Sequence, residues 1–468
     1  VVCHGRLPAP ADSAGSRPGM PSGLRQRGRD NGPRGQVDLV SSVRFVYRPA
    51  RMRFLSSFGV AVGTAAILLI STVTVGCGSD SEGSGTGGNA GSGGAAGAGG
   101  AVADPDELLA PGPYEVGYRE LPLTYSDAGT MNEREILLRV WYPAQSNSGA
   151  GPARYQVGGL VDLPAGIALD APPAIDDSAL PFAVYSHGNG GEGLLAYPYG
   201  ELMASHGWIV VGPNHTGNTA LDFLGMPDPL PRSALDRPYD ITTIIDEFES
   251  GLSGDDLAGK ADTSAVFVFG HSFGGYTTFA AGGADPDYDS AAEGCDGSTS
   301  PNCEVLNDPG VEAAYRAGFG DSRVVALAPQ APAIGLLQDG ELGDLGIPSM
   351  LMTGRLDQTT TQESSAEPSW AGLDDPDDIW VEMPSGAHFT FISICYDLTP
   401  ELLMLFRPDA PEDGCGPEFV DAEEAVPVLA AYVLAFGRRH VLGETQWDSV
   451  LKGPPLGNEG DFVVTLPE

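Results

Sequence analysis

One segment constrains the fold more than any other, an apolar run that ends in a tight turn around a serine. The run 266–269 is Val-Phe-Val-Phe, and the turn after it is Gly270-His271-Ser272-Phe273-Gly274. A turn between a buried strand and a helix is too tight for a Cβ atom beside the central serine, so glycine is needed on each side. We therefore expect a strand, a strained turn that exposes Ser272, and a helix that begins directly after it.

The chain around this segment predicts strands that alternate with helices. Two candidate strands, 119–125 and 135–142, are separated by turn residues and are expected to pair antiparallel. Further apolar runs follow at 182–185, 208–211, 265–269, 324–327, 349–353 and 379–383. Runs that are apolar throughout indicate strands of a parallel sheet that is covered on both faces.

A helix is expected to begin at Arg237-Pro238-Tyr239-Asp240, because proline is favoured in the first turn. Its apolar residues then fall on one face; they are Ile241, Ile244, Ile245 and Phe248. Strands and helices in this order predict an α/β fold, a doubly wound and mostly parallel sheet with helices on both faces.

The turn around Ser272 also suggests chemistry, because a serine hydroxyl becomes a nucleophile when an imidazole accepts its proton and a carboxylate orients that imidazole. In folds with this kind of nucleophile turn, the chain order is serine, acid, histidine. Only His388 and His440 follow Ser272 in the chain. His388 lies on a loop after the last apolar run, whereas His440 ends a helix, where a cationic cap explains it. We therefore expect Ser272 as the nucleophile and His388 as the base.

The acid of such a triad is expected at the carboxyl end of a strand. Asp357 follows the run 349–353 closely and is the acid that we predict. Asp339 and Asp344 are rivals in a looser context.

A second glycine-rich motif follows the run 182–185 and reads Ser186-His187-Gly188-Asn189-Gly190-Gly191. Attack on a carbonyl needs two backbone donors to hold the resulting oxyanion, one from the residue after the serine and one from a loop of this kind. We assign the N–H groups of Phe273 and Asn189 to that role. His187 precedes the turn of the loop and is expected to pack structurally.

The cysteines beyond residue 77 form two local pairs, Cys295 with Cys303 and Cys395 with Cys415. Disulfides are the simplest interpretation in an exported protein, and no spacing indicates a metal or a cofactor. Each pair lies within a stretch that a minimal fold does not need, the first from Asp285 to about Asp321 and the second from Phe389 to about Val420. The first stretch begins at Asp285-Pro286-Asp287-Tyr288-Asp289, a weak resemblance to a calcium loop in which Ser290 replaces the expected glycine. The apolar run 389–394 in the second is expected to form a wall of the active site, or else to fill the core.

The first 112 residues predict an export signal and a tether. Residues 52–77 have a short basic start, an apolar centre and then Cys77, as in a lipoprotein signal that is lipidated at the cysteine. An uncleaved membrane anchor is the alternative. Residues 1–51 are interpreted as a disordered extension or one that precedes the true start, 78–112 as a Gly/Ser-rich linker, and 113–468 as the catalytic domain. The protein is then exported, at the cell envelope or secreted.

Charge excludes one large class of partners. The chain has a formal net charge of −39. A surface of this sign repels phosphate backbones, so nucleic acid is not an expected partner. We expect a monomer that acts on a small ester or lipid and touches the membrane only through a lipid anchor.

Three motifs together resemble one group of proteins: the Ser186–Gly191 run, the segment 202–211 and the turn around Ser272. The chain resembles, over roughly residues 114–442, the α/β-hydrolases that include platelet-activating-factor acetylhydrolases, dienelactone-hydrolase-like proteins and cutinase-like bacterial polyester hydrolases. The resemblance implies the α/β-hydrolase fold and ester hydrolysis through an acyl-enzyme on Ser272.

The chain departs from each branch of this group. In the acetylhydrolases the acid follows the strand after the nucleophile helix, but here that strand continues as Ala-Pro-Gln-Ala-Pro at 328–332. The same run is similar to polyester hydrolases, whose acid follows the next strand, as Asp357 does. Those enzymes have a tryptophan where this chain has Ala333. Polyester hydrolase and phospholipid acetylhydrolase therefore stay as alternatives to a general esterase, and an idle ligand-binding lipoprotein is the alternative that is not an enzyme.

Overall fold

The computed structural model describes residues 104–467 except 128, 131, 165, 175–178, 253, 338–341 and 343–344. The predictions for 1–51 and for the signal segment 52–77 with Cys77 lie outside the described residues. The rival acids Asp339 and Asp344 also lie outside them.

The sheet has the predicted α/β architecture, and its order within the described residues is β12-β11-β10-β9-β8-β6-β7-β2-β1-β5. Strands β6 to β11 run parallel, β2 is antiparallel to both β7 and β1, and β12 is antiparallel to β11. The strands are β1 Glu115–Ser126, β2 Glu133–Ala144, β5 Ala168–Leu169, β6 Leu180–Ser186, β7 Ile209–Asn214, β8 Ala261–His271, β9 Val324–Gln330, β10 Met350–Gly354, β11 Ile379–Met383 and β12 Val463–Thr465. A hairpin of β3 Tyr155–Val157 and β4 Val161–Leu163 stands apart from this sheet.

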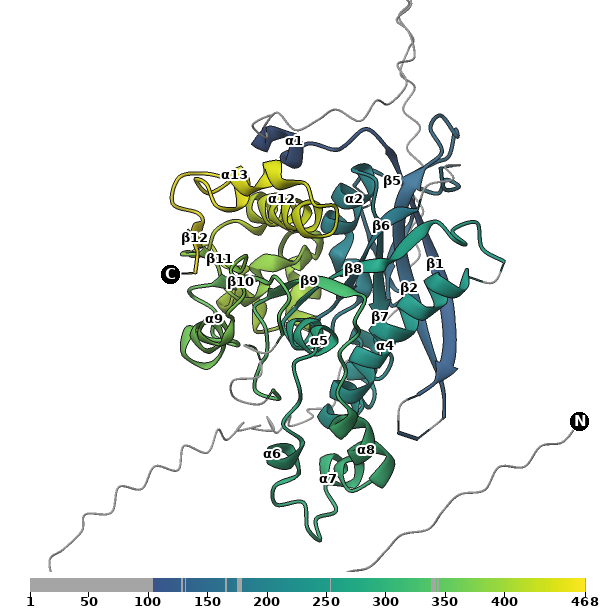
Figure 1. Ribbon diagram of the computed structural model, residues 1–468, viewed down its shortest axis with the longest axis vertical. Helices are drawn as coiled ribbons and strands as arrows, with labels where there is room; N and C mark the ends of the chain where they lie inside the picture. The colour runs from purple at the N-terminus through teal and green to yellow at the C-terminus, as the bar shows by residue number, and fades with distance from the viewer. Residues whose placement is uncertain are drawn as a thin grey trace, which may run out of the picture. The chain divides into compact units, whose positions relative to one another are not determined.

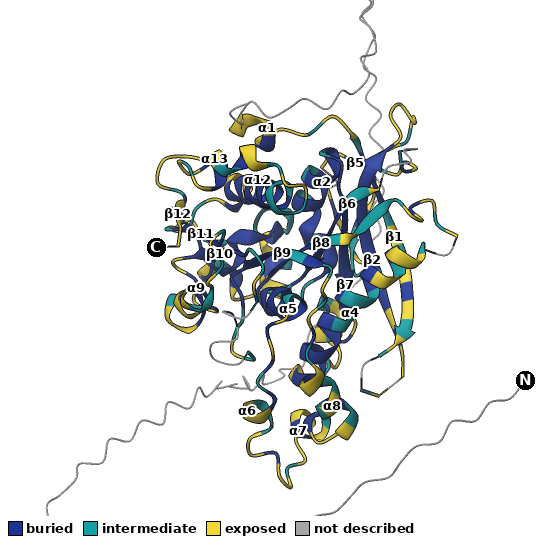
Figure 2. Cartoon of the chain, viewed as in Figure 1, coloured by how far each residue is buried: buried dark blue, intermediate teal, exposed yellow. Residues whose placement is uncertain are grey.

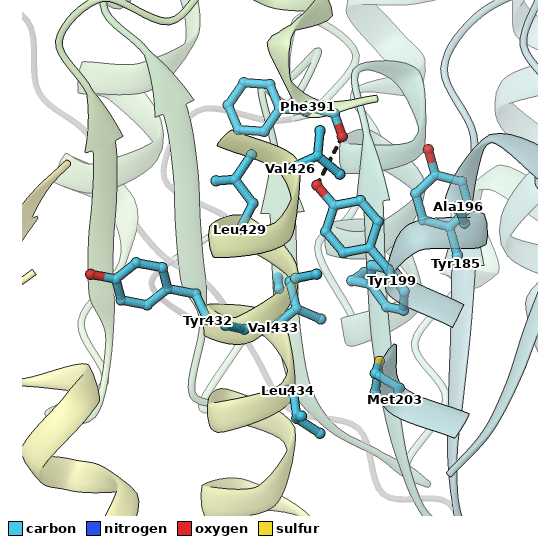
Figure 3. Close-up of a cluster of buried hydrophobic side chains, with 14 of the residues drawn as sticks. Tyr185, Ala196, Tyr199, Met203, Phe391, Val426, Leu429, Tyr432, Val433 and Leu434 are labelled. Atoms are coloured by element: carbon cyan, nitrogen blue, oxygen red, sulfur yellow. Dashed lines mark hydrogen bonds between the residues drawn. The ribbon is translucent and has the colours of Figure 1, made fainter. Parts of the chain in front are cut away.

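Helices cover both faces of the sheet, as Figure 1 shows. On one face α2 (Tyr197–Ser205) and α12 (Ala422–His440) pack together in a core cluster that also holds Phe389 and Phe391. Figure 3 shows part of this cluster, where the hydroxyl of Tyr199 donates to the carbonyl of Phe391 at 2.8 Å. On the other face α4 (Leu230–Ser250) and α5 (Phe273–Gly282) bury Ile241, Ile244, Ile245 and Phe248. The carboxyl-terminal parts of the central strands β6 and β8 are buried, as the dark blue in Figure 2 shows.

The remaining helices are shorter. They are α1 Pro105–Leu109, α3 Ala220–Leu224, α6 Tyr288–Ala292, α7 Pro301–Leu306, α8 Pro309–Ala317, α9 Glu367–Gly372, α10 Ile394–Asp397, α11 Pro400–Phe406 and α13 Asp448–Leu451. Helix α1 shows that ordered structure begins before residue 113, since Leu108 is fully buried. No helix in the described part of the chain is long and apolar enough to span a membrane.

The prediction that a helix begins at Arg237 was wrong, because α4 begins at Leu230 and Pro238 lies inside it. A proline in a helix cannot donate to the carbonyl four residues earlier, here that of Ala234. The hydroxyl of Tyr276, on the neighbouring helix α5, donates to this carbonyl at 3.1 Å. The packing of α4 on α5 therefore satisfies the group that the proline leaves unpaired.

Candidate active site

Ser272 lies at the end of the central strand β8, as the N-cap residue of α5, with φ 58° and ψ −115°. The flanking glycines are needed as predicted: a Cβ on Gly274 would lie 1.8 Å from the carbonyl oxygen of Ser186. Backbone hydrogen bonds hold the strained turn, since the N–H of Ser272 donates to Gln330 at 2.8 Å and its carbonyl accepts from Ala333 at 3.0 Å. Neighbouring strands thus stabilise a conformation that a non-glycine residue rarely adopts.

The three predicted triad residues meet at the carboxyl ends of parallel strands. Nε2 of His388 lies 2.9 Å from the hydroxyl oxygen of Ser272, and Nδ1 lies 2.8 Å from the carboxylate of Asp357. Asp357 follows β10 and His388 follows β11, so three successive crossovers bring them to one edge of the sheet. All three side chains are at least nine-tenths buried.

Asp357 is held by its own loop. One carboxylate oxygen accepts from the N–H groups of Thr359 and Thr360, at 2.8 and 2.6 Å. The other oxygen, which faces His388, lies 2.8 Å from the hydroxyl of Thr360. Because one oxygen is occupied by backbone donors, the carboxylate is fixed with its second oxygen toward the imidazole.

A second carboxylate, Asp413, links the loop of the acid to the loop of the base. Its side chain accepts from the N–H of Gln358 at 2.9 Å and from the hydroxyl of Thr359 at 2.7 Å, and it lies 3.3 Å from the N–H of His388. Burial raises the pKa of this carboxyl group. Asp413 belongs to the stretch that Cys395 and Cys415 close, and no sequence pattern indicates its role.

The predicted oxyanion donors stand on both sides of Ser272. Phe273 is the first residue of α5, so its N–H has no partner within the helix. Asn189 follows Gly188 in a turn that the N–H of Gly191 closes, at 3.0 Å from the carbonyl of Gly188. Gly188 lies directly against the nucleophile, because a Cβ there would be 3.3 Å from the Cβ of Ser272.

A second Ser–His–Asp arrangement, which the sequence analysis missed, lies behind the loop of Asn189. The hydroxyl of Ser186 lies 2.9 Å from Nε2 of His215, and Nδ1 of His215 lies 2.7 Å from the carboxylate of Asp240. Asp240 also forms a bidentate ion pair with Arg134, whose side chain donates to the two carboxylate oxygens at 2.8 and 2.9 Å. Although burial acts to raise it, Arg134 and His215 hold the pKa of Asp240 well below its usual range.

Arg237 lies beside this second arrangement. Its side chain is fully buried and lies against the backbone of the Asn189 loop. Burial lowers its pKa to about 9, so the group remains a cation at neutral pH.

His187 packs structurally, as expected. It is fully buried, its Nδ1 lies 2.7 Å from the carbonyl of Gly188, and its Nε2 accepts from the N–H of His215 at 3.0 Å. Burial lowers its pKa well below the usual value, so the ring is neutral.

Both predicted disulfides are present, Cys295 with Cys303 and Cys395 with Cys415. Most of the apolar run after His388 fills the core, as the alternative interpretation expected. The carboxylates near Asp285 have other roles: Asp287 caps α6 through the N–H of Ser290, and Asp289 pairs with Arg316. Among the described residues no cluster of His, Cys, Asp and Glu has the arrangement of a metal site.

No protein-family model and no curated protein matches this chain. Among solved structures it is similar to a ferulic acid esterase from Streptomyces cinnamoneus, with 20% sequence identity and a TM-score of 0.50. The match covers 77% of this chain and 99% of that chain. A likeness at this identity concerns the fold, and with the strand order and the serine turn it shows that the chain has the α/β-hydrolase fold.

Proposed function

We propose that this protein is a serine carboxylic-ester hydrolase that works through an acyl-enzyme on Ser272. The proposal rests on the hydrogen bonds that join Ser272, His388 and Asp357. Nε2 of His388 lies 2.9 Å from the hydroxyl of Ser272, and Nδ1 lies 2.8 Å from the carboxylate of Asp357. The similar solved structure is that of a ferulic acid esterase, which is consistent with ester hydrolysis.

The geometry supports a two-step reaction. The hydroxyl oxygen of Ser272 attacks the ester carbonyl carbon while its proton passes to Nε2 of His388. The electron pair of the carbonyl bond moves to oxygen, and the N–H groups of Asn189 and Phe273 face the resulting anion. The bond to the alcohol then breaks, and the alcohol leaves with the proton of His388. Water attacks the acyl-enzyme in the same way and releases the acid.

The surface beside the loop of Asn189 supports an ester with a substantial apolar part. Phe223, on α3, is half exposed and lies against this loop, since a Cβ on Gly190 would be 3.2 Å from its ring. Leu224 is 62% exposed and Met226 is 93% exposed in the same segment. An apolar rim of this kind favours substrates that bring apolar surface to the serine.

A chain-length series of nitrophenyl esters tests the proposal. We expect turnover by the wild-type protein that rises from acetate toward medium-length acyl chains, and its loss in Ser272→Ala. A phospholipid with a short second acyl chain and a polyester film, assayed alongside, distinguish the acetylhydrolase and polyester alternatives. A protein that binds long-chain esters without hydrolysing any of them would be the idle ligand-binding protein instead.

We also propose that the protein is an exported lipoprotein attached through Cys77. The basic start, apolar centre and cysteine of residues 52–77 support this. Labelling of cells with a radioactive fatty acid, with Cys77→Ser as the control, tests it, and an unlabelled wild-type protein would contradict it.

A further inference from the structure

Arg237 differs from the other buried arginine of its helix. Arg232, about one turn and a half earlier on α4, forms ion pairs with Asp236 and Asp127. Arg237 is fully buried, yet among the described residues no carboxylate lies within ion-pair distance of it. The carboxylate of Asp240 acts on it only from beyond ion-pair distance. A buried cation without a counter-charge in contact is costly to fold, which indicates another use for it.

The N–H groups of Arg237 point to the loop that carries Asn189. One terminal nitrogen donates to the carbonyl of His187 at 2.6 Å and to the hydroxyl of Ser186 at 3.2 Å. The other donates to the carbonyl of Gly188 at 3.2 Å and to the side chain of Asn218 at 2.6 Å. Two successive carbonyls of the loop are thus held by one planar guanidinium group.

Fixing the carbonyl of Gly188 also fixes the N–H of Asn189. The two groups lie in one trans peptide plane and point in opposite directions within that plane. Arg237 and Nδ1 of His187 hold the carbonyl on one side, so the N–H is turned to the other. The guanidinium carbon also lies 4.5 Å from the centre of the ring of Phe273, the residue that supplies the other donor. One side chain therefore contacts the ring of Phe273 and the carbonyl of Gly188, whose peptide group carries the N–H of Asn189.

We propose that Arg237 is the positioning residue of the oxyanion hole and holds the N–H of Asn189 in place. The inference rests on the proposed function, because the oxyanion arises only when Ser272 attacks an acyl carbonyl. A donor that is already fixed toward the developing anion needs no rearrangement during the reaction. Because the anion develops only on attack, the benefit of this positioning appears in the transition state and not in the bound ester.

The test compares Arg237→Met and Arg237→Lys with Arg232→Met, a matched removal of a buried arginine on the same helix. Rates are expressed per folded molecule, with the folded fraction taken from near-ultraviolet circular dichroism. We expect kcat to fall about 10²–10³-fold in Arg237→Met, as when an oxyanion donor is removed, while KM changes little. Arg237→Lys keeps the charge and one donor, and should recover part of the loss. An alkyl boronic acid, which forms a tetrahedral anion on the serine, should lose affinity in parallel with kcat.

The inference is wrong if kcat in the folded fraction of Arg237→Met stays within a few-fold of wild type, or if Arg232→Met loses as much. Should Arg237→Met fail to fold, the same criteria apply to Arg237→Lys, for which unchanged kcat and boronate affinity would overturn the inference. A wild-type protein that hydrolyses no ester contradicts the proposed function itself, which is a different outcome.

Discussion

The described part of the chain contains two Ser–His–Asp arrangements with nearly equal distances and different surroundings. In the first, the serine-to-imidazole and imidazole-to-carboxylate distances are 2.9 and 2.8 Å. In the second, around Ser186, they are 2.9 and 2.7 Å. The hydrogen bonds from serine to histidine to aspartate alone therefore do not distinguish an active site from a structural network.

The surroundings make the difference. Ser272 stands on a strained turn with positive φ, directly before Phe273, the first residue of α5. Ser186 is the last residue of an ordinary strand, is fully buried, and its oxygen already accepts from Arg237 at 3.2 Å. A nucleophile needs access and a place for the oxyanion. Of the two serines, Ser272 keeps 7% exposure and lies at the start of a helix, whereas Ser186 is 0% exposed.

The largest expected effect is that of Ser272→Ala, which should lower kcat by roughly 10⁴–10⁶-fold, since the nucleophile and its base act as a unit. The fold should be unchanged, because the backbone hydrogen bonds that hold the turn remain when the hydroxyl is removed. Ser186→Ala is the matched change, and we expect at most a tenfold loss from it. The measurement is the rate of hydrolysis of a nitrophenyl ester by each variant. A greater loss of kcat in Ser186→Ala than in Ser272→Ala would contradict the assignment of Ser272 as the nucleophile.

Asp357→Asn should lower kcat by about 10³–10⁴-fold, because the amide no longer selects the tautomer of His388 that accepts the serine proton. The control is Asp413→Asn, which keeps the size of the carboxyl group that links the two loops but leaves the triad intact. Steady-state rates with the same ester are the measurement. A greater loss in Asp413→Asn would mean that the acid is misassigned.

Asp240→Asn should act on stability, because it removes the bidentate partner of the buried Arg134 and leaves it only Asp236, at 3.3 Å. We expect a loss of roughly 3–5 kcal/mol in the free energy of unfolding, as when one member of a buried ion pair is removed. Urea unfolding measures it, with Asp162→Asn at an exposed ion pair as the control that should change little. Equal stabilities of the two variants would contradict a structural role for the second arrangement.

The smallest effect concerns pH and His215, whose pKa burial lowers to about 4. The unfolded chain binds a proton near pH 6.5, so the folded state loses stability through this group as the pH falls from 6.5 to 4. His215→Gln should therefore destabilise most above pH 6.5, and less as the pH approaches 4. Unfolding free energies of both proteins at several pH values test this, and a difference that is constant with pH would refute it.

The contrast also shows what the sequence could and could not predict. The strands were predictable because their apolar runs are continuous. The positions of Ser272, Asp357 and His388 were predictable because each lies within five residues of the end of such a run. His215, Arg237 and Asp240 carry no such signal, since they meet only when the end of β7 and the middle of α4 pack behind β6. Pro238 even gave a false signal, because it resembles a helix start while Tyr276 satisfies the carbonyl that it leaves free.

The most direct test of the account is the site of covalent labelling by a fluorophosphonate, mapped by mass spectrometry. This reagent reports an activated serine with access and oxyanion donors, which are the properties that separate the two arrangements. We predict a single adduct, on Ser272, which Ser272→Ala abolishes and Ser186→Ala keeps. An adduct on Ser186 or on another hydroxyl, or the absence of any adduct in a protein that hydrolyses esters, would contradict the account.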